Sequence, residues 1–311
     1  MDVNSFFFWV KEFMYALTGL VAILAGIRGL KNSTKAYGTF AFWVIVGCLF
    51  IFGAHIPYKV TGALICVLAL ITLTKQVSVG DFLAVPAEFK AEMADKHGNK
   101  IFIPALMIGV LSFVFLQFQI GGVKVPSAVA LGLASIVAII VCYIFFKPNT
   151  HDVTEDTSKM VMQVGPASLL PQLLTGLGAI FTAAGIGDMI SVGLSHVIPE
   201  SNMLIAVIIY CVGMALFTMI MGNGFAAFSV ITTGIAGPFL LSWGASPAVV
   251  GALGMTAGFC GTLMTPMAAN FNIVSASIME MKDTNGVIKA QVWYALILLI
   301  IHIGLMYFLA F

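Results

Sequence analysis

The residues best suited to chemistry gather at the end of one apolar run in the C-terminal third of the chain. The run begins at Gly251 and closes with Thr265, Pro266, Asn270 and Asn272. A proline within a helix frees a carbonyl one turn earlier, and threonine and asparagine side chains supply further oxygens and N–H groups. At membrane depth, such a break is tolerated only where the freed groups face protein or a water-filled cavity. The pattern therefore predicts an interrupted helix that binds a solute or an ion.

A second break is predicted at Gly222-Asn223-Gly224, with a further interruption at Pro238. Glycines on both sides of an asparagine let the backbone turn, and the asparagine both donates and accepts hydrogen bonds. Half-helix N-termini attract a carboxylate through the helix dipole, and freed carbonyls attract Na⁺. Close helix packing by small residues is the alternative interpretation.

We expect the two breaks to share one polar cavity, because unsatisfied polar groups in hydrocarbon cost several kcal/mol each. On an intact helix, Asn270 and Asn272 would point about 200° apart. Both reach one cavity only if the helix is interrupted after Pro266. The expected substrate-binding side chains are Asn223, Thr265, Asn270 and Asn272.

Asp188 lies within the sequence Gly185-Ile-Gly-Asp, deep in another apolar run. An intramembrane aspartate is by default a functional hypothesis. The same pattern occurs in intramembrane aspartyl proteases, but their chemistry needs a second carboxylate nearby, and no central apolar run contains one. Asp188 is therefore a candidate for binding a coupling cation or carrying a proton, and a helix cap near the interface is the alternative. No catalytic residue, metal site or cofactor is predicted.

The composition places these residues in a membrane protein. Hydrophobic residues make up 60% of the chain and charged residues 9%, with a mean hydropathy of +1.07. Soluble domains carry about 25% charged residues, so a water-facing surface of normal size is excluded. The net charge of +1 gives no reason to invoke nucleic acid.

The apolar runs predict an all-α, polytopic protein with about ten transmembrane helices. Residues 1–164 resemble a scaffold of regular helices, whereas residues 165–311 contain the Gly- and Pro-broken segments. Gly251, Gly254, Gly258 and Gly261 recur on one helix face and predict close helix contact. The expected spans are Phe6–Arg28, Tyr37–His55, Val60–Thr74, Ile101–Phe118, Val125–Phe146, Leu169–His196, Met203–Met221, Phe225–Trp243, Pro247–Ala268 and Val292–Leu309.

Two segments between the spans leave alternatives open. Gly165–Gln172 contains two prolines five residues apart, which we expect to prevent a long continuous helix; it forms either a capped loop or part of a re-entrant hairpin. The loop 75–100 forms either a plain linker or a partner-docking segment, and part of it fits an amphipathic helix on the membrane surface. Positive loops stay in the cytoplasm, and the basic residues predict a cytoplasmic loop 75–100 with both termini outside.

Three segments carry a resemblance to a known group of proteins: Gly176–Asp188, Gly222–Gly224 and Thr265–Asn270. They resemble the large, carboxylate-transporting ion transporter superfamily. Over essentially its full length, the chain is similar to the larger membrane subunits of two-subunit bacterial 5-oxoproline (pyroglutamate) transporters, a family first catalogued as a membrane domain of unknown function. The resemblance implies a second, smaller membrane subunit, a small carboxylate solute and a bacterial inner-membrane location. It leaves a homodimer or a heterodimer open.

The sequence thus favours a non-enzymatic subunit of a secondary transporter, a symporter that moves 5-oxoproline with H⁺ or Na⁺. One departure is that no Arg or Lys lies in a C-terminal span to pair with the carboxylate. Neutralisation would then come from backbone N–H groups, helix dipoles, a bound cation or the partner. The alternatives are a scaffold subunit whose partner holds the whole site, and an intramembrane enzyme.

Overall fold

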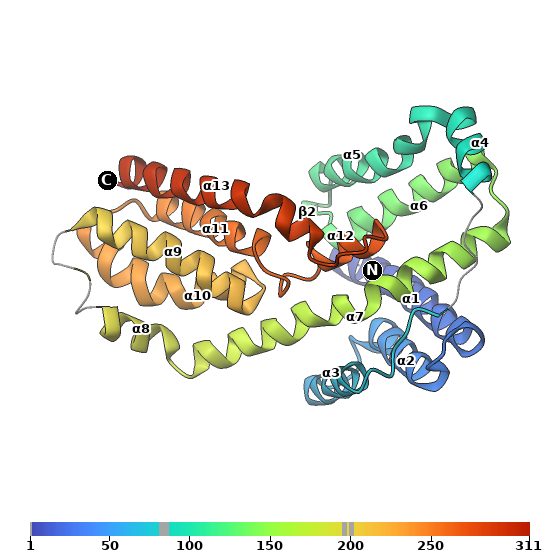
Figure 1. Ribbon diagram of the computed structural model, residues 1–311, viewed down its shortest axis with the longest axis horizontal. Helices are drawn as coiled ribbons and strands as arrows, with labels where there is room; N and C mark the ends of the chain where they lie inside the picture. The colour runs from blue at the N-terminus through green and yellow to red at the C-terminus, as the bar shows by residue number, and fades with distance from the viewer. Residues whose placement is uncertain (1, 81–86, 195–197, 199–201) are drawn as a thin grey trace. The chain divides into compact units, whose positions relative to one another are not determined.

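The structure is a computed structural model that describes the chain except residues 1, 81–86, 195–197 and 199–201. Most of the described residues are helical (Figure 1). One short antiparallel hairpin pairs β1 (Gln119–Ile120) with β2 (Val123–Lys124). The protein is an α-helical, multi-pass membrane protein, as the composition predicted.

Within the described residues, seven helical segments are long and apolar enough to cross a membrane. They are Val3–Lys31, Glu88–Gln117, Ser127–Phe146, Thr150–Ala183, Met203–Met221, Gly224–Trp243 and Gly286–Ala310. The expectation of ten spans also counted three apolar helices that are shorter, at 10–17 residues: Ala36–Phe52, Tyr58–Leu73 and Pro247–Leu263.

The chain divides into two compact units, Met1–Met162 and Gln163–Phe311. The boundary lies inside α7 (Thr150–Ala183), which contributes residues to both. The N-terminal unit contains α1 (Val3–Asn32), α2 (Ala36–Phe52), α3 (Tyr58–Leu73), α4 (Ala87–His97), η1 (Gly98–Phe102), α5 (Ile103–Gln117) and α6 (Ser127–Phe146).

The N-terminal unit is built around the helical hairpin of α1 and α2. Helix α1 begins after Asp2, whose carboxylate accepts the Ser5 N–H at 2.8 Å and so caps the helix. Hydrogen bonding by the Ser5 side chain, together with the Ser5 N–H, lowers the pKa of the Asp2 carboxyl. The two helices approach closely at glycines, since a Cβ on Gly19 would lie 2.6 Å from the Gly47 carbonyl oxygen. The hairpin β1–β2 joins α5 to α6, and α6 packs on α1.

The C-terminal unit surrounds α9 (Met203–Met221), whose Tyr210 and Met214 are fully buried. Helices α10, α11 and α13 pack against it (Figure 1). Besides α9, the unit contains α8 (Ile186–Leu194), α10 (Gly224–Ile231), η2 (Thr232–Leu240), η3 (Leu241–Trp243), α11 (Pro247–Leu263), α12 (Ile273–Ile278) and α13 (Gly286–Ala310).

The glycines of α11 form the close contact with α9. A Cβ on Gly254 would collide with the Tyr210 ring, one on Gly258 would lie 2.9 Å from Met214, and one on Gly261 would collide with the Ala215 backbone. The prediction of close helix packing is therefore confirmed for these three residues. Gly251 differs, because its nearest neighbour is Phe228, at 4.0 Å.

The prediction that the prolines of Gly165–Gln172 prevent a long helix is wrong. Helix α7 continues without interruption from Thr150 to Ala183. Each proline removes one backbone hydrogen bond, and a long helix at membrane depth tolerates that loss when neighbouring groups satisfy the freed carbonyl. The interruption comes later, at Gly185 with φ +68°, between α7 and α8. The end of the expected span Leu169–His196 lies outside the described residues.

Part of the loop 75–100 is helical. Helix α4 covers Ala87–His97 and is followed by the 3-10 turn η1. Phe82, Leu83 and Val85, which carried part of the expected amphipathic pattern, lie outside the described residues. The loop is therefore non-helical over residues 75–80 and helical from Ala87 onward, where it leads into α5.

Candidate functional site

The first helix break separates α9 from α10 and is very short. Gly222 adopts the left-handed conformation, with φ +61°, and its N–H donates to the Thr218 carbonyl at 2.7 Å. Asn223 follows in an extended conformation, and the next helix begins at Gly224. Glycine occupies the left-handed position because a side chain there is strained. The sequence therefore placed this break correctly.

Asn223 holds this break together with its side chain. Its Oδ1 accepts the N–H groups of Phe225 at 2.9 Å and Ala226 at 3.3 Å, and so caps α10. Its Nδ2 donates to the Thr175 hydroxyl on α7 at 3.1 Å. Both ends of the half-buried amide are engaged inside the protein. Thr175 was not anticipated, because its partner lies 48 residues away in the sequence.

The second break separates α11 from α12. Helix α11 ends at Leu263, before Pro266, and the next helix starts at Ile273. The predicted interruption is present, although it begins upstream of the proline. Thr265 is buried, its hydroxyl donates to the Met219 carbonyl at 2.8 Å, and it accepts the Met267 N–H at 3.2 Å. This side chain ties the second break to the last turn of α9.

Asn272 is fully buried and satisfies the open end of α11. Its Nδ2 donates to the carbonyls of Thr262 at 2.8 Å and Thr265 at 2.7 Å. Gln291, on α13, donates through Nε2 to Asn272 Oδ1 at 2.7 Å and to the Leu263 carbonyl at 3.1 Å. The carbonyls that we expected to attract Na⁺ are therefore hydrogen-bonded to two amide side chains. This network stabilises the break.

Sequence reasoning missed Gln291. It immediately precedes the expected span Val292–Leu309, and that boundary places it outside the membrane. The structure extends α13 back to Gly286, which places Gln291 within the helix. The feature that could have identified Gln291 is its position, since its amide side chain directly precedes an apolar run.

Asn270 has a different environment from Asn272. Its side chain is exposed and makes no hydrogen bond to any part of the chain that the structure describes. The expectation that Asn270 and Asn272 share one cavity with Asn223 is therefore wrong. Asn270 and Asn272 differ in burial because the loop places the Asn272 amide against α13 and leaves the Asn270 amide exposed.

The two breaks nevertheless adjoin one another. A Cβ on Gly222 would collide with the Met267 carbonyl, so the turn of the first break rests directly on the loop of the second. One turn before Gly222, the buried Thr218 Oγ1 has no hydrogen-bond partner among the described residues. A buried, unpaired hydroxyl is costly and calls for an explanation. No local pattern indicates this unpaired hydroxyl, because threonine in a helix usually bonds to its own backbone.

The remaining residues singled out from the sequence lie in different surroundings. Gly224 begins α10, and its nearest neighbour is the Phe259 ring at 3.7 Å. Pro238 lies inside η2, where the α-helix widens to a π-helix instead of breaking. The expectation of a backbone break at Pro238 is therefore wrong, because wider hydrogen bonding absorbs the missing N–H. Pro266 is exposed in the loop between α11 and α12.

Asp188 lies in the first turn of the short helix α8, just after the left-handed Gly185, and is exposed. The first turn favours a carboxylate because the helix dipole is positive there. A Cβ on Gly187 would lie 2.7 Å from the Thr233 hydroxyl, which shows how closely α8 packs on η2. The sequence suggested that Asp188 lies deep within a continuous apolar run. In the structure it lies instead at the start of a short helix.

Across the described residues, no group of three or more His, Cys, Asp or Glu side chains is placed to hold a metal ion. The five cysteines are free thiols. The polar groups at the two breaks are instead amides, hydroxyls and backbone carbonyls, which suit a small polar solute or a monovalent cation.

Comparison with known proteins gives one match. No curated protein and no solved structure matches the chain. A family model described as "Protein of unknown function (DUF979)" matches residues 12–311, almost the whole length. The chain belongs to the DUF979 family.

Proposed function

We propose that this chain is the larger membrane subunit of a secondary transporter that moves a small organic anion. The observation that carries the proposal is the meeting of two helix breaks, with Gly222 against the Met267 carbonyl and the Thr265 hydroxyl on the Met219 carbonyl. Transporters use interrupted helices to direct backbone dipoles at a solute near the bilayer midplane. The resemblance noted above supports 5-oxoproline as the solute.

The hydrogen bonds support separate structural and solute-contacting roles for the polar residues. Asn223, Thr265 and Asn272 hold the two breaks in shape, because their side chains are engaged inside the protein. Asn270 and Thr218 have no such partners among the described residues. We therefore assign solute contact to Asn270 and ion or solute contact to the Thr218 hydroxyl.

The negative charge of the solute must be compensated, and two sources of positive charge compensate it. The N-terminal end of α10 carries the positive end of a helix dipole beside the break. A symported Na⁺ or H⁺ supplies a full positive charge, with Asp188 as the candidate group that binds it. A bound cation adjacent to a carboxylate lowers the cost of both in the membrane.

The proposal includes a topology and a partner. The chain crosses the membrane ten times, with both termini outside and the loop 75–100 in the cytoplasm of a bacterial cell. A second, smaller membrane subunit completes the transporter as a heterodimer.

Uptake of labelled 5-oxoproline tests the function. Cells expressing this chain with its smaller partner should accumulate label faster than cells with an empty vector. Replacing Na⁺ with choline, or adding a protonophore, should identify the coupling ion by abolishing that gain. If both subunits are in the membrane and uptake equals that of empty cells, the assigned solute is wrong.

Asn270→Ala tests the site. We expect uptake to fall while the protein remains folded, since Asn270 makes no internal hydrogen bond in the described chain. Asn285→Ala is the matched control, because Asn285 is also exposed and its side chain does not cap α13. Unchanged kinetics in Asn270→Ala would remove Asn270 from the site. If Thr218→Val were also unchanged, a scaffold subunit would be favoured over a solute-binding one.

Cysteine labelling tests the topology. Ala94→Cys on the exposed face of α4 should resist a membrane-impermeant thiol reagent added to intact cells. Tyr58→Cys, at the exposed start of α3, should react. The unmodified chain controls for its own cysteines. Rapid reaction of Ala94→Cys from outside would reverse the proposed orientation.

A further inference from the structure

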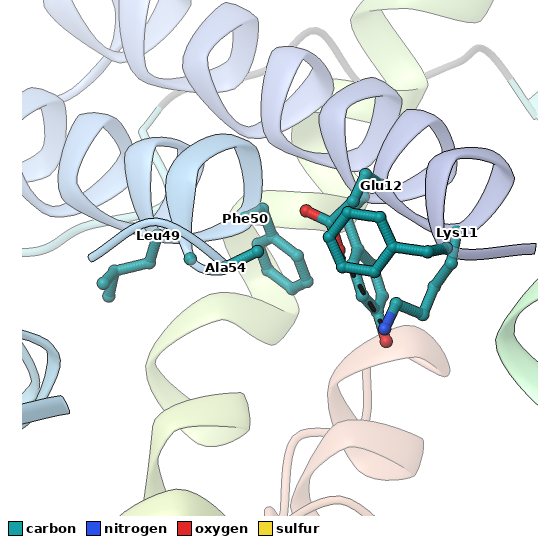
Figure 2. Close-up of a pocket in the computed structure, with 8 residues that line it drawn as sticks. Lys11, Glu12, Leu49, Phe50 and Ala54 are labelled. Atoms are coloured by element: carbon teal, nitrogen blue, oxygen red, sulfur yellow. Dashed lines mark ion pairs between the residues drawn. The ribbon is translucent and has the colours of Figure 1, made fainter. Parts of the chain in front are cut away.

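A cavity of about 380 Å³ lies in the N-terminal unit (Figure 2). It opens between the first half of α1 and the end of α2. The side chains that line it are aromatic, apolar and charged: Phe8, Lys11, Glu12, Tyr15, Leu49, Phe50, Gly53 and Ala54. Its size is in the usual range for small-molecule sites, about 300–1,000 Å³.

The cavity contains one cation and one carboxylate that are poorly matched to each other. Lys11 Nζ lies 4.0 Å from Glu12 Oε1, at the limit of an ion pair, because adjacent residues on a helix point in different directions. Glu12 is only 12% exposed, yet its carboxylate accepts no hydrogen bond within the described chain. A nearly buried charge without good partners is costly. The two groups thus retain most of their capacity to bind a ligand.

Aromatic rings complete the binding surface. Lys11 Nζ lies 5.3 Å from the Phe8 ring centroid, so this ring already supports a cation. The rings of Tyr15 and Phe50 lie 6.3 Å apart, on α1 and α2 respectively. Figure 2 shows Glu12 on the side of the cavity that faces Phe50 and Ala54. A ligand ammonium near Glu12 would therefore meet both a carboxylate and aromatic faces.

The surrounding residues place the cavity at the level of lipid headgroups. The antiparallel hairpin brings the start of α1, the end of α2 and the start of α3 to the same side. Trp9, Phe52 and Tyr58, one from each helix, are 56%, 52% and 96% exposed. Exposed aromatic side chains at helix ends mark the membrane–water interface.

We propose that this cavity binds the zwitterionic headgroup of phosphatidylethanolamine. Lys11 pairs with the phosphate, and Glu12 accepts the N–H groups of the ammonium beside the aromatic rings. Phosphatidylcholine has a quaternary ammonium without N–H donors, and phosphatidylglycerol has no cation. The site therefore selects phosphatidylethanolamine through Glu12. This assignment is independent of the transport function proposed above.

The test is native mass spectrometry of the purified full chain in detergent, titrated separately with each of these three phospholipids. Because only phosphatidylethanolamine donates hydrogen bonds to the Glu12 carboxylate, we expect it to bind roughly tenfold more tightly than phosphatidylcholine, a difference of about 1.4 kcal/mol. Glu12→Gln should remove that preference. Glu92→Gln, on the exposed face of α4, makes the same charge change outside the cavity and should retain it.

A second variant keeps the proposal testable if Glu12→Gln does not fold, as judged by circular dichroism. Lys11→Gln should weaken binding of all three phospholipids, since each has a phosphate, and should leave the preference for phosphatidylethanolamine over phosphatidylcholine. Equal binding of the two lipids by the unmodified chain would overturn the proposal. So would retention of the preference in folded Glu12→Gln.

Competition with free phosphoethanolamine tests whether the cavity binds a lipid or a soluble molecule with the same headgroup. Added in excess, it should displace bound phosphatidylethanolamine only weakly, because the lipid also buries acyl chains against the apolar helix surface. Displacement at equal concentration would show that the cavity takes a soluble zwitterion, and would overturn the lipid assignment.

Discussion

The two helix breaks of the C-terminal unit are held in different ways. Between α9 and α10 the chain turns within Gly222 and Asn223, and a single side chain caps the following helix. Between α11 and α12 the chain is non-helical from Met264 to Asn272, and amides from two separate elements bind the exposed carbonyls. A short break depends on local backbone chemistry, whereas a long break depends on side chains brought by other helices.

This difference separates the polar residues that shape the breaks from those that remain free. Within the long break, Asn272 is buried in its network and Asn270 is exposed. Within the short break, both ends of Asn223 are engaged. The longer loop therefore has room for one amide to stabilise the structure and another to contact a solute.

The largest expected effect is at the long break. Asn272→Ala leaves the carbonyls of Thr262 and Thr265 and one bond of Gln291 unsatisfied. At about 1–3 kcal/mol for each buried group, we expect a loss of about 3 kcal/mol or more in the free energy of unfolding. The measurement is the unfolding midpoint in detergent, followed by circular dichroism. Asn270→Ala is the control and should unfold at the original midpoint.

The contact between the two breaks should be the next most sensitive position. Gly222→Ala forces a Cβ into a left-handed residue and against the Met267 carbonyl, and should cost about 1–3 kcal/mol. Gly224→Ala places the same methyl group in ordinary contact with the Phe259 ring, 3.7 Å away, and should be tolerated. Equal destabilisation by both substitutions would contradict the close approach of the two breaks.

A smaller effect is expected at the cap of the short break. Asn223→Ala removes the acceptor for the Phe225 and Ala226 N–H groups and should cost about 1 kcal/mol. Asn223→Asp keeps that acceptor but cannot donate to Thr175, so it should recover most of the loss. If the aspartate variant is as unstable as the alanine variant, the link to Thr175 matters more than the cap.

The smallest effect on stability is expected at Thr218. Thr218→Val replaces an unpaired, buried hydroxyl with a methyl group, so the free energy of unfolding should stay within about 0.5 kcal/mol or rise. Thr262→Val is the comparison, because its hydroxyl donates to the Phe259 carbonyl at 2.6 Å. Uptake by Thr218→Val should fall if this hydroxyl contacts the solute or ion. A large loss of stability in Thr218→Val would show that the hydroxyl has a structural partner.

The sequence alone determined the class of protein and the positions of the two principal breaks. A composition with so few charged residues leaves no water-facing surface of normal size, whatever the helix arrangement. Gly222 and the polar segment after Gly261 mark interruptions because the conformational freedom of glycine and the missing N–H of proline are local properties. The same local reasoning overestimated the effect of Pro171 and Pro238, since a surrounding helix can absorb one lost hydrogen bond.

Only the tertiary structure decided which polar residues are free. Asn270 and Asn272 are chemically identical and nearly adjacent, and their difference arises from Gln291, 19 residues beyond Asn272 on another helix. The cavity beside Glu12 likewise needs Phe50, at the end of α2, and Ala54, just after α2, opposite α1. A hydrogen-bond partner or a cavity wall from a distant segment leaves no local pattern in the sequence, because packing brings the two together only when the chain folds.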